Sequence, residues 1–287
     1  MESSVSAAVF MLNEIDMTKD IIEELEQVKQ IGEIILVTPC KEAVPRFSGY
    51  QKLRIILEEK REGKSNAVQK AIDSTDKKYM LHVTGDSRIK AAEIERLIDT
   101  ATLSGSGAAV SLVKVLNTRH SIMGKVDALL WEIYNETNRF LNTINKAKSG
   151  DVFIFERGLV HTIPGSLIND DAYIDSVING QSAGITQSAA VISITGPYTP
   201  RDYITQRSRV AQGHFQLIFK HGITPNSLIF SSHIPFSMRV RIFIKAVRAD
   251  KAYVPMTPVF LFLEGVSVLL GLKNLSKQTN IWAQIKK

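Results

Sequence analysis

The sequence predicts an α/β fold with a mainly parallel sheet flanked by helices. Short apolar runs alternate with helical patterns over the first two thirds of the chain, which is typical of strand–helix–strand units. The hydrophobic fraction of 44% and the charged fraction of 22% are those of an ordinary globular protein. A length of 287 residues is sufficient for one large domain or two small ones.

The elements follow in order from their periodicity. We predict strands at residues 7–12, 33–38, 53–57, 79–83, 108–115, 152–155 and 189–194. Apolar residues at helical spacing predict helices at residues 17–31, 64–73, 91–103 and 121–146. Thr199 and Pro200 form a typical helix start, an N-cap hydroxyl followed by proline, and predict a helix to about Phe219.

The character of the chain changes after residue 232. Residues 233–251 interleave basic and apolar side chains, and residues 254–272 are almost wholly apolar apart from Glu264. We therefore expect a main domain at residues 1–220 and a C-terminal helical extension at residues 221–287. The pattern favours helices on a membrane surface, with basic side chains at anionic headgroups. A pair of core helices and a membrane span are the alternatives.

Composition narrows the function classes. The formal net charge of +6 is mild for this length and does not indicate nucleic-acid binding. The single cysteine, Cys40, excludes an internal disulfide and is typical of a reducing compartment. The N-terminal stretch contains acidic residues and lacks the apolar core of a signal peptide, so we expect a cytoplasmic protein. If the C-terminal extension lies on a membrane, we expect a peripheral position on its cytoplasmic face.

Two polar clusters in the first hundred residues are candidates for a ligand site. Arg61 and Lys64 flank the flexible Gly63 just before a helix, where backbone N–H groups favour a diphosphate; a solvated basic turn is the alternative. Asp86 follows the strand at 79–83 and is placed to ligate Mg²⁺ or Mn²⁺, or only to cap a turn. His82, in that strand, is expected to be a core or wall residue.

Two further clusters lie in the second half. Asp170 and Asp171 open a predicted helix, where a carboxylate serves as a general base or simply favours the helix N-terminus. Gln206 and Arg209 are spaced i, i+3 and project from one helix face, while Arg207 points elsewhere. A surface helix with solvated arginines is the alternative for this last cluster.

Taken in order, these clusters resemble the family 2 glycosyltransferases of the GT-A fold over residues 5–215. The matching elements are Asn13-Glu14, the R-x-G-K-x-x-A-like element of Arg61, Gly63, Lys64 and Ala67, the end of a D-x-D motif at Asp86, the E-D-like pair Asp170-Asp171, and the Q-x-x-R element of Gln206 and Arg209. The sequence departs from the family where Thr84 replaces the first D-x-D acid and where Thr38-Pro39-Cys40-Lys41 replaces an acidic nucleotide-reading turn.

The resemblance implies inverting transfer of a sugar from a nucleoside diphosphate sugar. Asp171, beside Asp170, would be the base, and a divalent ion on Asp86 would offset the charge of the departing diphosphate, with weak metal dependence because one acid is missing. Arg61, Lys64, Gln206 and Arg209 would lie at the diphosphate, and Asn13 and Glu14 would line the nucleotide pocket. The basic, apolar extension suggests a lipid-linked acceptor, such as a polyprenyl phosphate or a glycolipid.

Two other functions remain open from the sequence. A degenerate member would bind nucleotide sugar without catalysis, and the missing carboxylates motivate that alternative. A sugar-phosphate nucleotidyltransferase shares the nucleotide-binding α/β plan, although residues 7–20 lack its glycine-rich loop.

Overall fold

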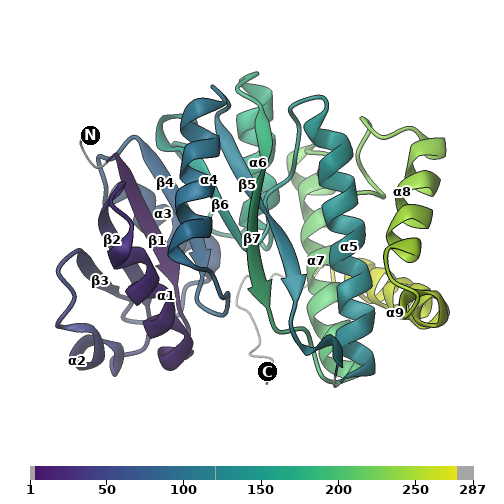
Figure 1. The fold of residues 1–287 in the computed structure, drawn as a ribbon, viewed down its shortest axis with the longest axis horizontal. Coiled ribbons are helices and arrows are strands. Elements are labelled where there is room, and N and C mark those ends of the chain that lie inside the picture. Colours follow the sequence, from purple (N-terminus) through teal and green to yellow (C-terminus); the bar gives the residue numbers. More distant parts are fainter. Residues whose placement is uncertain (1–3, 120, 277–287) are drawn as a thin grey trace.

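The fold is built around one seven-stranded sheet (Figure 1). The computed structural model describes residues 4–119 and 121–276. The strand order is β3-β2-β1-β4-β6-β5-β7, and all neighbours run parallel except β6, which is antiparallel to both β4 and β5. The strands are β1 (Val5–Phe10), β2 (Ile31–Thr38), β3 (Leu53–Leu57), β4 (Tyr79–Thr84), β5 (Ala108–Val115), β6 (Val152–Glu156) and β7 (Ile185–Ile194).

Helices connect these strands and cover both faces of the sheet. They are α1 (Ile15–Gln27), α2 (Ala43–Phe47), α3 (Lys64–Asp73), α4 (Ala91–Leu103), α5 (Ile122–Asn142), α6 (Asp170–Gly180), α7 (Pro200–His221), α8 (Phe236–Ala249) and α9 (Tyr253–Lys273), with short 3-10 turns η1 (Asn117–Arg119) and η2 (Arg157–Leu159). Because side chains alternate along a strand, the central strand β1 serves two cores. Ala7 packs in the cluster that contains Leu97 of α4, and Ala8 in the cluster that contains Val68 of α3 and Ile174 of α6.

The predicted fold class is confirmed. The strands at 53–57 and 108–115 and the helices at 64–73 and 91–103 have the predicted bounds, and β7 begins four residues before its predicted start. The cap at the start of α7 is also confirmed, because Thr199 Oγ1 accepts a hydrogen bond from Asp202 N at 3.1 Å. The helix ends at His221, where Gly222 adopts a left-handed φ of 66°.

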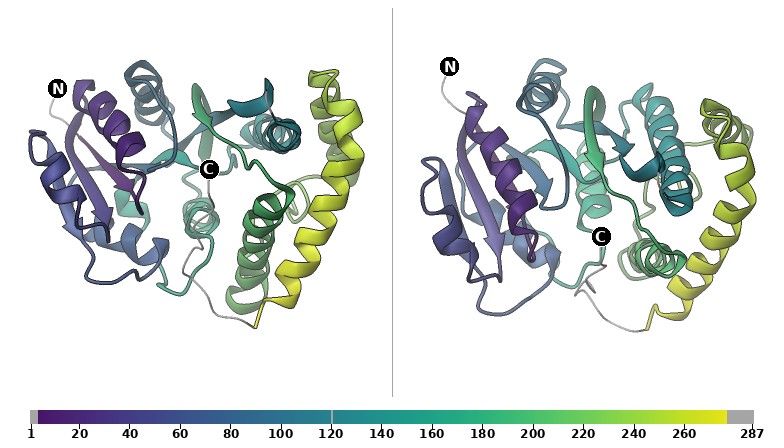
Figure 2. Two further views of the ribbon diagram at one scale, coloured as in Figure 1. Left: turned by 90° about the horizontal axis from the view of Figure 1, so that it is seen from below. Right: turned by 60° about the horizontal axis from the view of Figure 1, so that its bottom comes forward.

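The C-terminal helices share a hydrophobic core with the rest of the chain. Ala246 of α8 and Leu263 of α9 are buried in one cluster with Val126 and Leu129 of α5 and Tyr203 of α7. Figure 2 shows α9 running alongside α7. The division at residue 220 stays a prediction, but the two helices are packed against α5 and α7 rather than separate from them.

A partly buried polar contact and a small residue hold α9 against α7. Arg207 donates hydrogen bonds from Nε and Nη2 to the two carboxylate oxygens of Glu264, at 2.8 and 3.0 Å, and Tyr203 Oη donates to Glu264 Oε1 at 2.8 Å. Further along, a Cβ on Gly271 would lie 2.7 Å from Ser208 O, so the backbones approach closely only because this residue is glycine. Glu264 thus belongs to the contact between the helices.

The outer face of α9 has the opposite character. Its large apolar side chains are exposed at Val254, Val259, Leu261, Phe262, Leu269 and Leu272. Within the described residues, α9 is the one helix that is long and apolar enough to cross a membrane. One face is packed and the other is apolar and exposed, as expected for a helix on a membrane surface, and membrane association stays a prediction.

Candidate active site

The candidate site lies at the edge of the sheet where β1 and β4 end. Gly85 N donates a hydrogen bond to Phe10 O at 2.9 Å, which joins the segments that follow these two strands. A Cβ on Gly85 would lie 2.8 Å from Phe10 O, so this approach requires glycine. Asp86 is thereby held at the exit of β4, as predicted.

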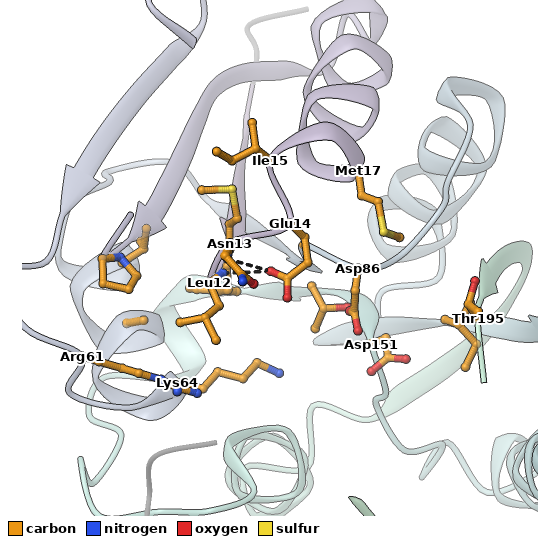
Figure 3. Close-up of a pocket in the computed structure, with 18 of the residues that line it drawn as sticks. Leu12, Asn13, Glu14, Ile15, Met17, Arg61, Lys64, Asp86, Asp151 and Thr195 are labelled. Carbon is orange, nitrogen blue, oxygen red and sulfur yellow. Dashed lines mark hydrogen bonds between the residues drawn. The ribbon is translucent and has the colours of Figure 1, made fainter. Parts of the chain in front are cut away.

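The antiparallel strand β6 brings a second carboxylate to the same edge. Because β6 runs opposite to β4, its beginning lies where β4 ends, and Thr84 N donates to Asp151 O at 3.2 Å. Asp86 and Asp151 both line a cavity of about 680 Å³, which we call the sheet-edge cavity. Figure 3 shows both carboxylates beside this cavity.

Six of the predicted site residues line the sheet-edge cavity: Asn13, Glu14, Arg61, Lys64, Asp86 and Gln206. The Glu14 carboxylate also shapes the cavity wall, because it accepts hydrogen bonds from the backbone N–H groups of Leu12 and Asn13, each at 3.1 Å (Figure 3). Asp127, on α5, lines the cavity too. Sequence reasoning missed Asp127 and Asp151.

The cationic side of the cavity comes from the turn before α3. Gly63 precedes the helix with a left-handed φ of 100°, and Lys64 is its first residue. Burial opposes the positive charge of Lys64, but four carboxylates, those of Asp170, Asp171, Asp151 and Asp86, outweigh it and raise its pKa. Burial lowers the pKa of the Arg61 guanidinium, partly offset by nearby glutamates.

Asp170 and Asp171 are adjacent in sequence but have different surroundings. Asp170 is 2% exposed, and its Oδ2 lies 3.6 Å from Lys64 Nζ and 3.5 Å from His82 Nε2. Burial opposes ionisation of Asp170, yet Lys64 and His82 outweigh it and lower its pKa to about 2. His82 is fully buried, as expected for a core residue, and burial lowers its pKa to about 4.

Asp171 lines a second cavity, of about 370 Å³, which we call the helical cavity. Burial and the neighbouring charge of Asp170 raise the pKa of Asp171, so its proton affinity exceeds that of an ordinary aspartate. Residues that line both cavities are Lys64, Asp127, Asp151 and Gln206. The two cavities therefore adjoin. Asp171, the carboxylate with the raised pKa, lines the helical cavity and not the sheet-edge cavity.

The polar residues of α7 differ in which of the two cavities they line. Gln206 lines both cavities, whereas Arg207 lines the helical cavity and pairs with Glu264. Arg209 lines neither of the two cavities. Burial and the charge of Arg61 lower the pKa of Arg209 to about 9, and Asp170 partly offsets this, so Arg209 lies within electrostatic reach of the site.

Carboxylates at the sheet-edge cavity offer oxygen ligands for a divalent metal ion. The described residues contain no group of three or more His, Cys, Asp or Glu side chains that suits a metal ion. Asp86 and Asp151 supply two carboxylates at one cavity, and Mg²⁺ in phosphate-transfer sites commonly uses one or two carboxylates with substrate oxygens. These two residues fit an ion that a bound diphosphate completes.

The sheet with one antiparallel strand and this carboxyl-edge cavity defines the class: the chain has the GT-A fold, as expected from the resemblance. It is similar to the mannosyltransferase PcManGT from Pyrobaculum calidifontis in complex with GDP-Man and Mn²⁺, with a TM-score of 0.64 and 14% identity over 95% of this chain and 86% of that one. Neither a protein-family model nor a curated protein matches the sequence.

Two synthases of sugar-linked 3-phosphoglycerates share the fold as well. Glucosyl-3-phosphoglycerate synthase from Mycobacterium tuberculosis, in complex with Mn²⁺, UDP and glucosyl-3-phosphoglycerate, has a TM-score of 0.55 and 15% identity over 77% of this chain and 80% of that one. Mannosyl-3-phosphoglycerate synthase from Rubrobacter xylanophilus has a TM-score of 0.54 and 14% identity over 76% of this chain and 75% of that one. At these identities the similarity establishes the fold.

Proposed function

We propose that this protein is an inverting glycosyltransferase of the family 2 type, which moves a sugar from a nucleoside diphosphate sugar to an acceptor. One observation carries the proposal. A cavity with basic residues and carboxylates adjoins a second cavity that contains Asp171, and the two share Lys64 and Gln206. This is the arrangement needed to hold a donor on one side of the reacting carbon and an acceptor on the other.

The sheet-edge cavity is the proposed donor site. Arg61 and Lys64 bind the diphosphate, and Asp86 with Asp151 would hold Mg²⁺ or Mn²⁺ against its oxygens. The metal, when bound, supplies positive charge to the departing diphosphate. Val37 of β2 and Pro39, which follows this strand, line the nucleotide side where related proteins carry acids. Glu58 lines the cavity beside them, since its backbone N–H donates to Thr38 O at 2.9 Å.

The proposed reaction is a single in-line displacement. Asp171 accepts the proton of the acceptor hydroxyl or phosphate as its oxygen bonds to the anomeric carbon, while the bond from that carbon to the diphosphate oxygen breaks. Lys64 and Arg61 stabilise the negative charge that the diphosphate gains. The raised pKa of Asp171 suits a proton acceptor, whereas Asp170 stays ionised and keeps Lys64 in place.

The helical cavity is the proposed acceptor site, and its walls favour an apolar acceptor. Phe243 of α8 and Phe260 of α9 line it. Leu261 also lines it and is 53% exposed, so the cavity reaches the outer face of α9. We infer a lipid-linked acceptor, delivered while α8 and α9 rest on an anionic membrane surface. Flotation with anionic vesicles tests this: a chain that stays in solution contradicts it.

A comparison of wild type with Asp171→Asn tests the enzymatic proposal. Loss of a general base typically costs about 10²- to 10⁴-fold in rate, so transfer and donor hydrolysis should fall by that order. Binding of UDP or GDP, measured by thermal shift with and without Mn²⁺, should persist. The exposed Asp76→Asn is the matched control. Unchanged turnover in Asp171→Asn would refute the assigned base, and nucleotide binding without turnover in wild type would favour a degenerate binding protein.

A further inference from the structure

Lys148 is a cation that the proposed reaction does not use. It lies in the loop between α5 and β6, and its side chain lines the helical cavity. The ammonium group lies over the Tyr134 ring, with Nζ 4.4 Å from the ring centroid. In residues 4–119 and 121–276, no hydrogen bond or ion pair to this ammonium is formed.

The backbone of Lys148 is fixed by side chains of α5. Asn138 holds it from both sides: Lys148 N donates to Asn138 Oδ1 at 2.8 Å, and Asn138 Nδ2 donates to Lys148 O at 2.9 Å. Tyr134 Oη donates to the same carbonyl oxygen at 2.8 Å. Three hydrogen bonds thus position this residue before any ligand arrives, as expected for a preorganised binding group.

Two other cations that line the helical cavity already have a carboxylate beside them. Arg207 is paired with Glu264, and Lys64 lies beside Asp170. Ser149 N donates to both carboxylate oxygens of Asp175, and burial raises the pKa of this carboxyl to about 8.

The surroundings of Lys148 disfavour the charged form of its ammonium group. Burial, together with the charge of Arg207, lowers the pKa of its ammonium to about 8, and Asp171 and Asp175 offset only part of this. A partly buried cation of this kind is stabilised by an anion that enters the cavity.

One part of the cavity wall is apolar, while carboxylates such as Asp151 and Asp170 line another part. Trp131, from α5, lines it together with Phe243, Phe260 and Val268 from α8 and α9. A ligand that satisfies both parts carries an anionic group at Lys148 and a hydrocarbon part among these side chains. Asp171 lines the same cavity and its charge acts on Lys148, so the anionic end of such a ligand would lie near the reacting end.

We propose that Lys148 is the anion-binding residue of the acceptor site and that it selects acceptors in which a phosphate is attached to an apolar chain. This inference rests on the proposed function, because it assigns the acceptor of that reaction.

Isothermal titration calorimetry with three probes tests it. Geranyl phosphate has both parts, geraniol lacks the phosphate, and glycerol 3-phosphate lacks the hydrocarbon. Wild type, Lys148→Met, Lys148→Arg and the exposed Lys114→Met are compared, and each is titrated with UDP and GDP in parallel. A urea midpoint equal to that of wild type shows that a variant is folded.

We expect wild type to bind geranyl phosphate more tightly than either partial probe. Lys148→Met should lose about ten- to hundredfold in affinity for geranyl phosphate, the range of a charge-assisted hydrogen bond, and little for geraniol. Lys148→Arg should recover most of the loss, and Lys114→Met should bind as wild type does.

Three results would overturn the inference. If wild type and Lys148→Met bind geranyl phosphate with equal affinity, Lys148 is not the anion-binding residue. If glycerol 3-phosphate binds as tightly as geranyl phosphate, the site does not select acceptors with an apolar chain. No binding of geranyl phosphate by a wild type that binds UDP or GDP refutes the acceptor assignment alone, whereas failure of both nucleotides refutes the proposed function beneath it.

Discussion

Replacing Glu264 with glutamine tests how firmly α9 is held to α7. The Glu264 carboxylate accepts hydrogen bonds from Arg207 Nε, Arg207 Nη2 and Tyr203 Oη, all between 2.8 and 3.0 Å. The side chains of Arg207 and Glu264 are 23% and 15% exposed, so solvent screens the pair only in part. Burial raises the pKa of Glu264, but the charge of Arg207 and these hydrogen bonds outweigh it and lower that pKa.

The expected loss follows from leaving Arg207 partly buried without its counter-charge. Removal of one partner from a buried pair costs about 3–5 kcal/mol, and partial exposure together with the hydrogen bonds that glutamine retains lowers this to roughly 2–3 kcal/mol. At an unfolding entropy of about 2.1 cal/mol/K per residue, 287 residues give about 0.6 kcal/mol/K, so the melting temperature should fall by roughly 3–5 °C.

Urea denaturation and thermal melting of Glu264→Gln measure this loss, and the exposed Glu42→Gln is the matched control. A double variant, Arg207→Met with Glu264→Gln, should lose less stability than the sum of the two single variants, because it no longer buries an unpaired charge. Additive losses, or a shift in Glu264→Gln no larger than in Glu42→Gln, would refute the reasoning.

Two further predictions concern the packing and the pH dependence of stability. Gly271→Ala should destabilise the chain by about 1–3 kcal/mol in urea, because its Cβ meets backbone atoms of α7, whereas Gly265→Ala, with open space around it in the same helix, should stabilise it by up to about 1 kcal/mol; equal effects would contradict this. Asp175 keeps its proton to a pKa of about 8 in the folded chain, against an ordinary value of 3.8, so its contribution to stability is lost as pH rises between these values. Asp175→Asn should therefore flatten the fall in unfolding free energy from pH 5 to pH 8, and profiles of equal slope would exclude this role.

The sequence predicted those parts of the site that follow directly from strand ends and helix starts. Asp86 was placed correctly because an apolar run ends just before it, and Lys64 because Gly63 marks the start of α3. Asp151 was missed because no periodicity reports the direction of a strand. Its position depends on β6 running antiparallel to β4, which is set by the packing of the whole sheet.

Arg209 shows the limit of helical spacing. Three residues turn a helix by almost a full circle but also advance about 4.5 Å along its axis. Gln206 lines both cavities and Arg209 lines neither, although Val210 and His214 lie further along α7 and line the helical cavity. The rotation of about 60° by which three residues fall short of a full turn therefore separates Arg209 from the cavities, rather than its position along the axis. Lys148 had no signal in the sequence, since its role depends on Asn138 and Tyr134 of the preceding helix.

The order of two neighbours on α7 has a practical consequence. Gln206 forms part of the wall between the cavities, and the next residue, Arg207, forms an ion pair with Glu264 of α9. A change in the tilt of α9 would therefore be transmitted through Arg207 to the adjacent Gln206 and so to the two cavities. Under the proposed membrane contact and the proposed reaction, detergents that replace the bilayer around this helix would alter turnover as well as solubility, a form of interfacial activation. A preparation that is silent in micelles should be assayed again in liposomes before it is judged inert.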